Sequence, residues 1–143
     1  MNREREFRAW LIDEKKMVEV DAINFKSEVI FYTVDKEIDG EIIDTLQTRF
    51  FKEIELIEYT GLKDKNGVKI FESDIVKIVG YHHSTPHKIE EENFVVVWSF
   101  ERWVLQRKLK NGGVEETLLG DEDDEVIGNI YENPELLEVE DES

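Results

Sequence analysis

Residues 58–79 restrict the fold of this chain more than any other segment, because two turn signals and a β-rich run follow one another within it. The segment reads EYTGLKDKNGVKIFESDIVKIV. Gly61 and the pair Asn66-Gly67 can adopt a positive φ angle at little steric cost, and an Asn-Gly pair is a strong local signal for a tight reversal. The segment therefore predicts a chain reversal between Leu62 and Val68.

Most of the remaining chain consists of short β-branched and aromatic runs, which favour strands. The run 94–98 (FVVVW) is the most apolar of them, and we expect it to be central in a sheet. Residues 35–57 stay ambiguous, because short apolar runs do not separate helix from strand by their period. Within them, 41–46 fits a helical turn or a strand, and a strand is favoured over 50–57. The other predicted strands cover residues 7–12, 17–20, 29–34, 75–79, 94–98, 103–109 and 114–119.

The connections carry turn and loop chemistry. Residues 70–74 are predicted to form a helical or 3₁₀ turn, and Gly80 to end the strand before a polar loop over 81–93. Residues 121–125 (DEDDE) are predicted to form a solvated turn. Asn133-Pro134-Glu135 predicts the start of a short helix, with Asn133 as the cap and proline at the first helical position.

Many short strands and few helices indicate an all-β, mainly antiparallel barrel or sandwich. Closing a barrel would also remove the edges that such strands otherwise expose. No internal repeat or linker divides the chain. We therefore predict a single domain over residues 1–143, with an acidic tail from about residue 138.

Composition narrows the class of protein. The chain has 143 residues, a net charge of −17 and no cysteine. The charge disfavours binding to nucleic acid or to anionic membranes, and it would steer partners of opposite sign towards the protein. The missing thiols exclude disulfides and thiol catalysis and fit a reducing compartment. With no apolar leader or membrane-length run, the sequence predicts a cytoplasmic protein.

No group of residues predicts catalysis, a cofactor or a metal. His82, His83 and His87 lie close in sequence, as metal ligands often do, but without fixed strand or helix spacing. The acidic run 121–125 lacks the ligand spacing of a calcium loop, and residues 64–67 are better explained as a turn. No nucleophile elbow or phosphate-binding loop is present. The sequence therefore predicts no catalytic, cofactor-binding or metal-binding residue.

Aromatic residues offer the best candidates for a binding surface. Trp98, Phe100 and Trp103 flank a predicted hairpin tip, where exposed rings can anchor a partner or stack on bases. Large aromatic side chains more often fill cores, and we expect this of Trp98, whereas the other two stay open. The turn over residues 60–67 is a second candidate surface, although a folding requirement explains it equally well.

Three motifs, in this order and over nearly the whole length, carry a resemblance to a known family. They are EFRAW at 6–10 followed by Lys16-Met17, YTGLKDKNG at 59–67 running into DIV at 74–76, and VIGNIYENPELL at 126–137. Together they resemble the YopX family of small proteins encoded by bacterial phages and prophages. The resemblance implies an SH3-like barrel of complex topology with one or two short helical turns, and no assigned activity. Ser73 stands where the family usually has glycine, which puts a positive φ at position 73 in doubt, and Glu58 stands where glutamine is common.

Three functional hypotheses follow. The first is a non-catalytic, acidic protein-interaction module that binds an unknown host or phage protein; mimicry of nucleic acid is a special case. The second is a nucleic-acid-binding SH3-like module, which the charge opposes unless Lys63, Lys65, Lys69, Arg102, Arg107, Lys108 and Lys110 gather on one face. An enzyme of unknown type is the third, and it has no positive support. The sequence leaves open whether the chain forms a homo-oligomer.

Overall fold

The computed structural model describes residues 5–82 and 85–138. Its contacts divide the chain into two compact units, Asn2–Glu58 and Tyr59–Ser143. The single domain over residues 1–143 stays a prediction. Within the described part, regular structure is antiparallel β apart from two short 3₁₀ helices, which confirms the all-β prediction.

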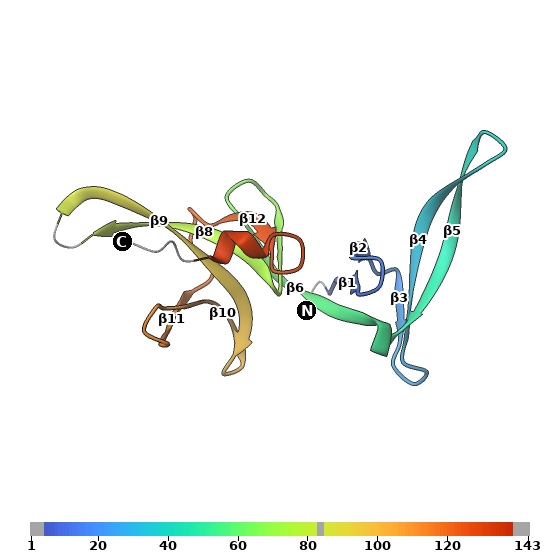
Figure 1. The fold of residues 1–143 in the computed structure, drawn as a ribbon, viewed down its shortest axis with the longest axis horizontal. Helices are drawn as coiled ribbons and strands as arrows, with labels where there is room; N and C mark the ends of the chain where they lie inside the picture. Colours follow the sequence, from blue (N-terminus) through green and yellow to red (C-terminus); the bar gives the residue numbers. More distant parts are fainter. Residues whose placement is uncertain (1–4, 83–84, 139–143) are drawn as a thin grey trace. The chain divides into compact units, whose positions relative to one another are not determined.

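The elements follow in chain order along both units (Figure 1). They are β1 (Phe7–Leu11), β2 (Lys16–Glu19), β3 (Ala22–Asn24), β4 (Val29–Ile38), β5 (Glu41–Phe50), η1 (Phe51–Glu53), β6 (Ile54–Lys63), β7 (Lys69–Phe71), β8 (Asp74–His82), β9 (Thr85–Ser99), β10 (Arg102–Lys108), β11 (Val114–Leu118), β12 (Glu125–Asn129) and η2 (Pro134–Leu137).

The N-terminal unit is built from two sheets. Strand β1 lies between β2 and the first half of β6, and β4 lies between β3 and β5. Because side chains alternate along a strand, Ala9 and Leu11 of β1 point together into a core that also holds Val18, Ile30 and Tyr32. The ambiguous residues 41–46 are strand, since all ten residues of β5 pair with β4 across a two-residue turn.

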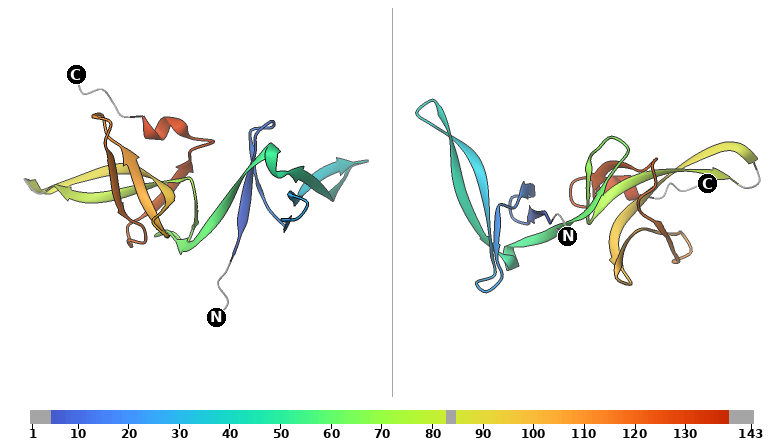
Figure 2. Two further views of the ribbon diagram at one scale, coloured as in Figure 1. Left: turned by 90° about the horizontal axis from the view of Figure 1, so that it is seen from below. Right: turned by 180° about the vertical axis from the view of Figure 1, so that it is seen from behind.

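The C-terminal unit holds a five-stranded sheet of order β11-β10-β9-β8-β12, which curls into a half-barrel (Figures 1 and 2). Strand β9 is central, as its apolar run predicts. One face of this sheet packs around Ile70, Val76, Phe94, Val96 and Leu105. This unit contains the second half of β6, to which β7 pairs.

Two local predictions are wrong. Residues 70–74 are not a helical turn: Ile70 is fully buried in β7, and Ser73 makes a tight turn into β8 with a φ of 70°. Of the loop predicted over 81–93, the described residues 81–82 and 85–93 are strand: β8 continues past Gly80, which pairs with Glu90 of β9. Strands pair through backbone N–H and C=O groups and do not require apolar side chains, so the polar composition of 81–93 was misleading.

Two further predictions hold in part. The predicted strand over 50–57 starts only at Ile54, because η1 occupies Phe51–Glu53. Helix η2 begins with Pro134 at its first position, as predicted, but Asn133 is not a side-chain cap. Its Oδ1 instead accepts a hydrogen bond from the Asn129 backbone N–H at 3.3 Å. The acidic tail predicted from about residue 138 lies outside the described residues beyond Glu138.

Candidate functional site at the β9–β10 hairpin

The β9–β10 hairpin presents different chemistry on its two faces. Phe94 and Val96 of β9 point into the core of the C-terminal unit, whereas Val95 and Val97 lie on the opposite face and line a groove. The strands pair antiparallel from Ser99 and Arg102 at the tip to Val95 and Gln106. The hairpin is therefore a rigid element with two surfaces that can meet a partner: its tip and its groove.

The tip is a two-residue turn formed by Phe100 and Glu101. Their φ angles are 48° and 64°, so both occupy the left-handed region that favours Gly and Asn. Such a conformation costs roughly 1–2 kcal/mol per non-glycine residue. Phe100 is 92% exposed, so no packing within its own unit offsets that cost. The turn thus holds a large apolar ring in water in a strained conformation, which is a pattern typical of functional positions.

Two tryptophans extend this aromatic surface. The rings of Trp98 and Trp103 pack edge to face with their centroids 4.9 Å apart. Trp103 is half-buried against the core, but Trp98 is 52% exposed, so the expectation that Trp98 fills the core is wrong. Trp98 is exposed because of its position: its side chain is on the same face of β9 as those of Phe94 and Val96, but it lies near the hairpin tip. We call Trp98, Phe100 and Trp103 the aromatic tip.

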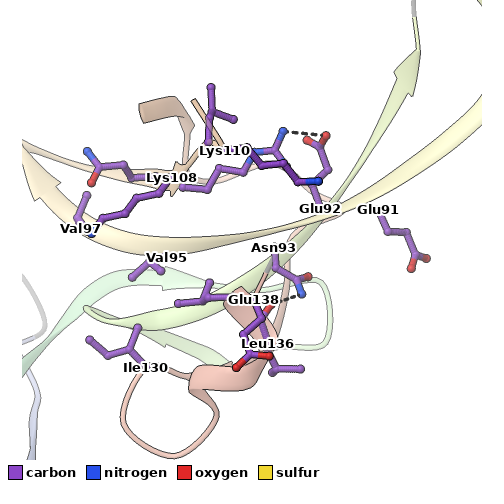
Figure 3. Close-up of a pocket in the computed structure, with 14 residues that line it drawn as sticks. Glu91, Glu92, Asn93, Val95, Val97, Lys108, Lys110, Ile130, Leu136 and Glu138 are labelled. Atoms are coloured by element: carbon purple, nitrogen blue, oxygen red, sulfur yellow. Dashed lines mark hydrogen bonds and ion pairs between the residues drawn. The ribbon is translucent and has the colours of Figure 1, made fainter. Parts of the chain in front are cut away.

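The groove on the other face has a volume of about 840 Å³. Its apolar lining comes from Val95, Val97, Leu109, Ile130, Leu136 and Leu137. Figure 3 labels Val95, Val97, Ile130 and Leu136 among them. Helix η2 forms one wall and is tied to β9 by Asn93, whose Nδ2 donates a hydrogen bond to the Leu136 carbonyl at 2.9 Å. Figure 3 shows Lys108 and Lys110 on the opposite side of the groove from Leu136.

Ion pairs compensate part of the positive charge near the groove. The Arg107 guanidinium bonds Glu92 at 3.1 Å and Glu115 at 2.6 Å and lies over the Phe94 ring. Elsewhere in the unit, the Lys65 Nζ lies 3.0 Å from a carboxylate oxygen of Glu125. This ion pair holds the pKa of Glu125 below its ordinary value. Lys65 and Arg107, both among the cations that a nucleic-acid site would have to gather, are thus held by carboxylates.

The turn at residues 64–67 serves the fold. One oxygen of Asp64 accepts the backbone N–H groups of Asn66 and Val68 at 2.8 and 2.9 Å, and the other accepts that of Val126 at 2.9 Å. Desolvation raises the pKa of this buried carboxyl, but these N–H groups outweigh it and the pKa lies below its ordinary value. Thr60 is also used internally, since its hydroxyl donates to the Ile70 carbonyl at 2.7 Å.

The acidic run is a turn with one inward member. Asp121, Glu122 and Asp123 are exposed as expected, but Asp124 is only 1% exposed. Its Oδ2 accepts the N–H groups of Gly120 and Asp121 at 3.0 and 3.1 Å. Burial raises the pKa of Asp124 despite these bonds. The expectation of a solvated turn over 121–125 is therefore wrong for Asp124, which is buried, and for Glu125, which is half-buried and begins β12.

The predicted absence of metal and catalytic residues stays a prediction. His82 ends β8 and His87 lies in β9, while His83 lies outside the described residues. Residues 5–82 and 85–138 contain no group of three or more His, Asp or Glu side chains arranged to hold a metal ion. In the same part of the chain, no helix is long and apolar enough to cross a membrane.

Sequence reasoning named Trp98, Phe100 and Trp103 as a candidate surface, although it expected Trp98 in the core, and it did not find the groove. Aromatic residues beside a predicted turn can be seen in the sequence, whereas a groove needs β9, β10 and η2 brought together. The only local signal for it was the unbroken apolar run from Phe94 to Val97, because a strand that is apolar on both faces needs covering on both.

Comparisons with known proteins give matches over nearly the whole chain. A model of the YopX protein family matches residues 6–138. The crystal structure of protein EF1440 from Enterococcus faecalis is similar, with a TM-score of 0.65 and 27% sequence identity over 96% of this chain and 100% of that chain. No curated protein matches the sequence.

Proposed function

Since the chain belongs to the YopX family, in which the resemblance implies no assigned activity, we propose that it is a non-catalytic binding module of a phage or prophage. It acts in the host cytoplasm and docks its aromatic tip on a host or phage protein that carries a basic surface. The observation that carries the proposal is Phe100, held 92% exposed in a strained turn beside Trp98 and Trp103.

Aromatic residues of this kind supply most of the affinity in protein interfaces. Trp and Tyr are enriched among the residues whose truncation costs the most binding free energy, because they bury large areas with few rotatable bonds. The edge-to-face contact of Trp98 with Trp103 fixes both rings before a partner arrives. Little side-chain entropy is then lost on binding.

Charge selects the partner. A net charge of −17 raises the rate of encounter with a basic surface and opposes encounter with nucleic acid. The ion pairs of Lys65 and Arg107 further reduce the cationic surface that a nucleic acid would need. These contacts favour the protein-binding hypothesis over the nucleic-acid-binding alternative.

The test starts with a tagged pull-down from phage-carrying host cells at moderate salt, with and without nuclease. A protein recovered stoichiometrically is then purified, and its affinity for the wild-type chain and for Phe100→Ala is measured by calorimetry. We expect a loss of about 2 kcal/mol, roughly 30-fold in Kd, for this variant. Phe25→Ala is the matched control, because Phe25 is a comparably exposed phenylalanine (69%) in the N-terminal unit.

Four outcomes would count against the proposal. Recovery of only nuclease-sensitive material would favour the nucleic-acid hypothesis, and an empty pull-down would leave the tip without a partner. Equal affinities for the Phe100→Ala and Phe25→Ala variants would show that the partner binds elsewhere. Affinity that does not fall with salt would contradict a basic partner.

A further inference from the structure

The β4–β5 hairpin of the N-terminal unit extends beyond the strands that support it. Strand β3 pairs with β4 only as far as Phe31, and beyond it β4 and β5 continue as a two-stranded ribbon (Figure 1). We call residues 35–46 the arm. Isolated two-stranded ribbons are marginally stable in water, so an arm of this length gains from being covered.

The arm and the base of β5 expose an apolar stripe on one face. Ile42, Leu46 and Phe50 lie four residues apart on the same face of β5, and all three are exposed. The outer edge of β5 pairs with no strand among the described residues. It contains neither the proline nor the lysine with which edge strands commonly prevent pairing. Its length of ten residues, about 33 Å, suits strand addition.

The backbone of β5 is oriented for such an addition. Asp39 and Gly40 form the two-residue turn with φ angles of 52° and 81°, so Ile38 and Glu41 are its flanking, hydrogen-bonded pair. Since N–H and C=O groups alternate in direction along a strand, those of the even-numbered residues of β5 face the open edge. The residues of the apolar stripe are therefore the ones that would bond an added strand.

We infer that the partner at this edge is a second copy of the same chain, with the two β5 strands pairing antiparallel about a two-fold axis at Leu46. This register places Leu46 opposite its own symmetry mate and Ile42 opposite Phe50 of the partner subunit. Asp44 then faces Thr48 of the partner subunit, whose hydroxyl can donate to the carboxylate. An axis at Asp44 would oppose two carboxylates, and one at Thr45 would set Leu46 against a carboxylate. The Leu46 axis sets all three residues of the apolar stripe against apolar residues of the partner strand and separates like charges.

The interface joins two highly acidic chains, so its salt dependence is opposite to that of the proposed basic partner. Repulsion between copies of charge −17 weakens as salt screens it. Added salt should therefore strengthen the dimer, whereas it should weaken binding at the aromatic tip. The open edge of β5 and the aromatic tip are separate surfaces, so a negative result for one proposal does not count against the other.

Oligomeric state gives the first test. Light scattering on the full chain should yield twice the 16.9 kDa chain mass, with the dimer fraction rising with salt. Leu46→Lys should halve that mass, because it places two ammonium groups at the axis. Leu118→Lys should leave the mass unchanged, since Leu118 is equally exposed (65% against 62% for Leu46) on β11 of the other unit. A wild-type monomer at all salt concentrations would overturn the inference.

Cysteine pairing gives the register, because the natural chain has no cysteine. Leu46→Cys should crosslink to a dimer under mild oxidation or with a short thiol crosslinker. Ile42→Cys should not, because eight residues, about 27 Å, would separate the two thiols in this register. An equimolar mixture of Ile42→Cys and Phe50→Cys should crosslink between the two variants. Crosslinking of Ile42→Cys to itself, or none for Leu46→Cys, would overturn the register.

Discussion

Replacing Asp64 with Asn tests how a single carboxylate holds the C-terminal unit together. Both oxygens of Asp64 accept backbone N–H groups: one serves Asn66 and Val68, the other serves Val126. Asn keeps one acceptor oxygen but presents an NH₂ group in place of the other. In the more favourable orientation, the amide oxygen keeps the bonds from the Asn66 and Val68 N–H groups. The amide NH₂ then faces the Val126 N–H, so that two donors oppose each other.

The cost follows from that mismatch. One hydrogen bond to a charged acceptor is worth about 1.5–3 kcal/mol, and leaving a buried N–H unsatisfied costs about 1–3 kcal/mol; the two overlap, so we expect about 3 kcal/mol in all. For a chain of this size, 3 kcal/mol corresponds to a fall in Tm of about 10 °C. The assay is thermal and urea unfolding at pH 7, followed by tryptophan fluorescence and repeated by circular dichroism.

Asp124→Asn is the matched control. Asp124 is also buried, but only Oδ2 accepts hydrogen bonds, and its Oδ1 is buried without a partner among the described residues. The amide keeps the accepting oxygen and removes a desolvated charge. We expect stability to change by less than about 1 kcal/mol. Equal effects of the two substitutions would refute the assignment of roles, and so would an Asp64→Asn variant as stable as wild type.

The two carboxyls also predict opposite pH dependences. The pKa of Asp64 is lowered in the folded chain, so its contribution is present above its ordinary pKa of about 3.9 and is lost as pH falls through the folded value. The pKa of Asp124 is raised, so its contribution is present below about 3.9 and is lost as pH rises through the folded value. Acidification should therefore shrink the deficit of Asp64→Asn. It should make Asp124→Asn less stable relative to wild type.

Three backbone predictions concern positive φ angles. The double variant Phe100→Asn, Glu101→Gly should raise the free energy of unfolding by about 1 kcal/mol while weakening partner binding, because it relieves the strained turn and removes the exposed ring; urea unfolding without a stability gain would contradict the strain. Ser73→Gly should raise stability by about 0.5–1 kcal/mol, because Ser73 has a φ of 70° while its backbone bonds Val96 and Ile130; an unchanged urea midpoint would count against it. Gly67→Ala should lower stability by about 1 kcal/mol, because the alanine would have to adopt the positive φ (79°) of Gly67, although its methyl group would meet no neighbouring atom. A stabilised variant would contradict this account.

Turn chemistry and strand composition could be read from the sequence because their causes are local. Asn66-Gly67 and Asp39-Gly40 reverse the chain wherever they lie, since their φ preferences do not depend on distant neighbours. The apolar run 94–98 predicted a central strand for a similar reason, because a run apolar on both faces needs covering on both. Local chemistry also marked Phe100 and Trp103 as candidates for a binding surface, and the three spaced motifs identified the family.

Pairing and burial were decided only by the tertiary structure. Residues 81–82 and 85–93 are strand because β8 and β9 continue to bond through their backbones, which the sequence of side chains does not reveal. Asp124 cannot be told from its acidic neighbours until the fold turns it inward onto two N–H groups. Trp98 lies on the face of β9 that carries the core residues, and only its place near the end of the hairpin leaves it exposed. The sequence determines the local conformation that each residue prefers. Its burial and its strand partner depend on segments far along the chain, because those segments supply the atoms that cover it or bond to it.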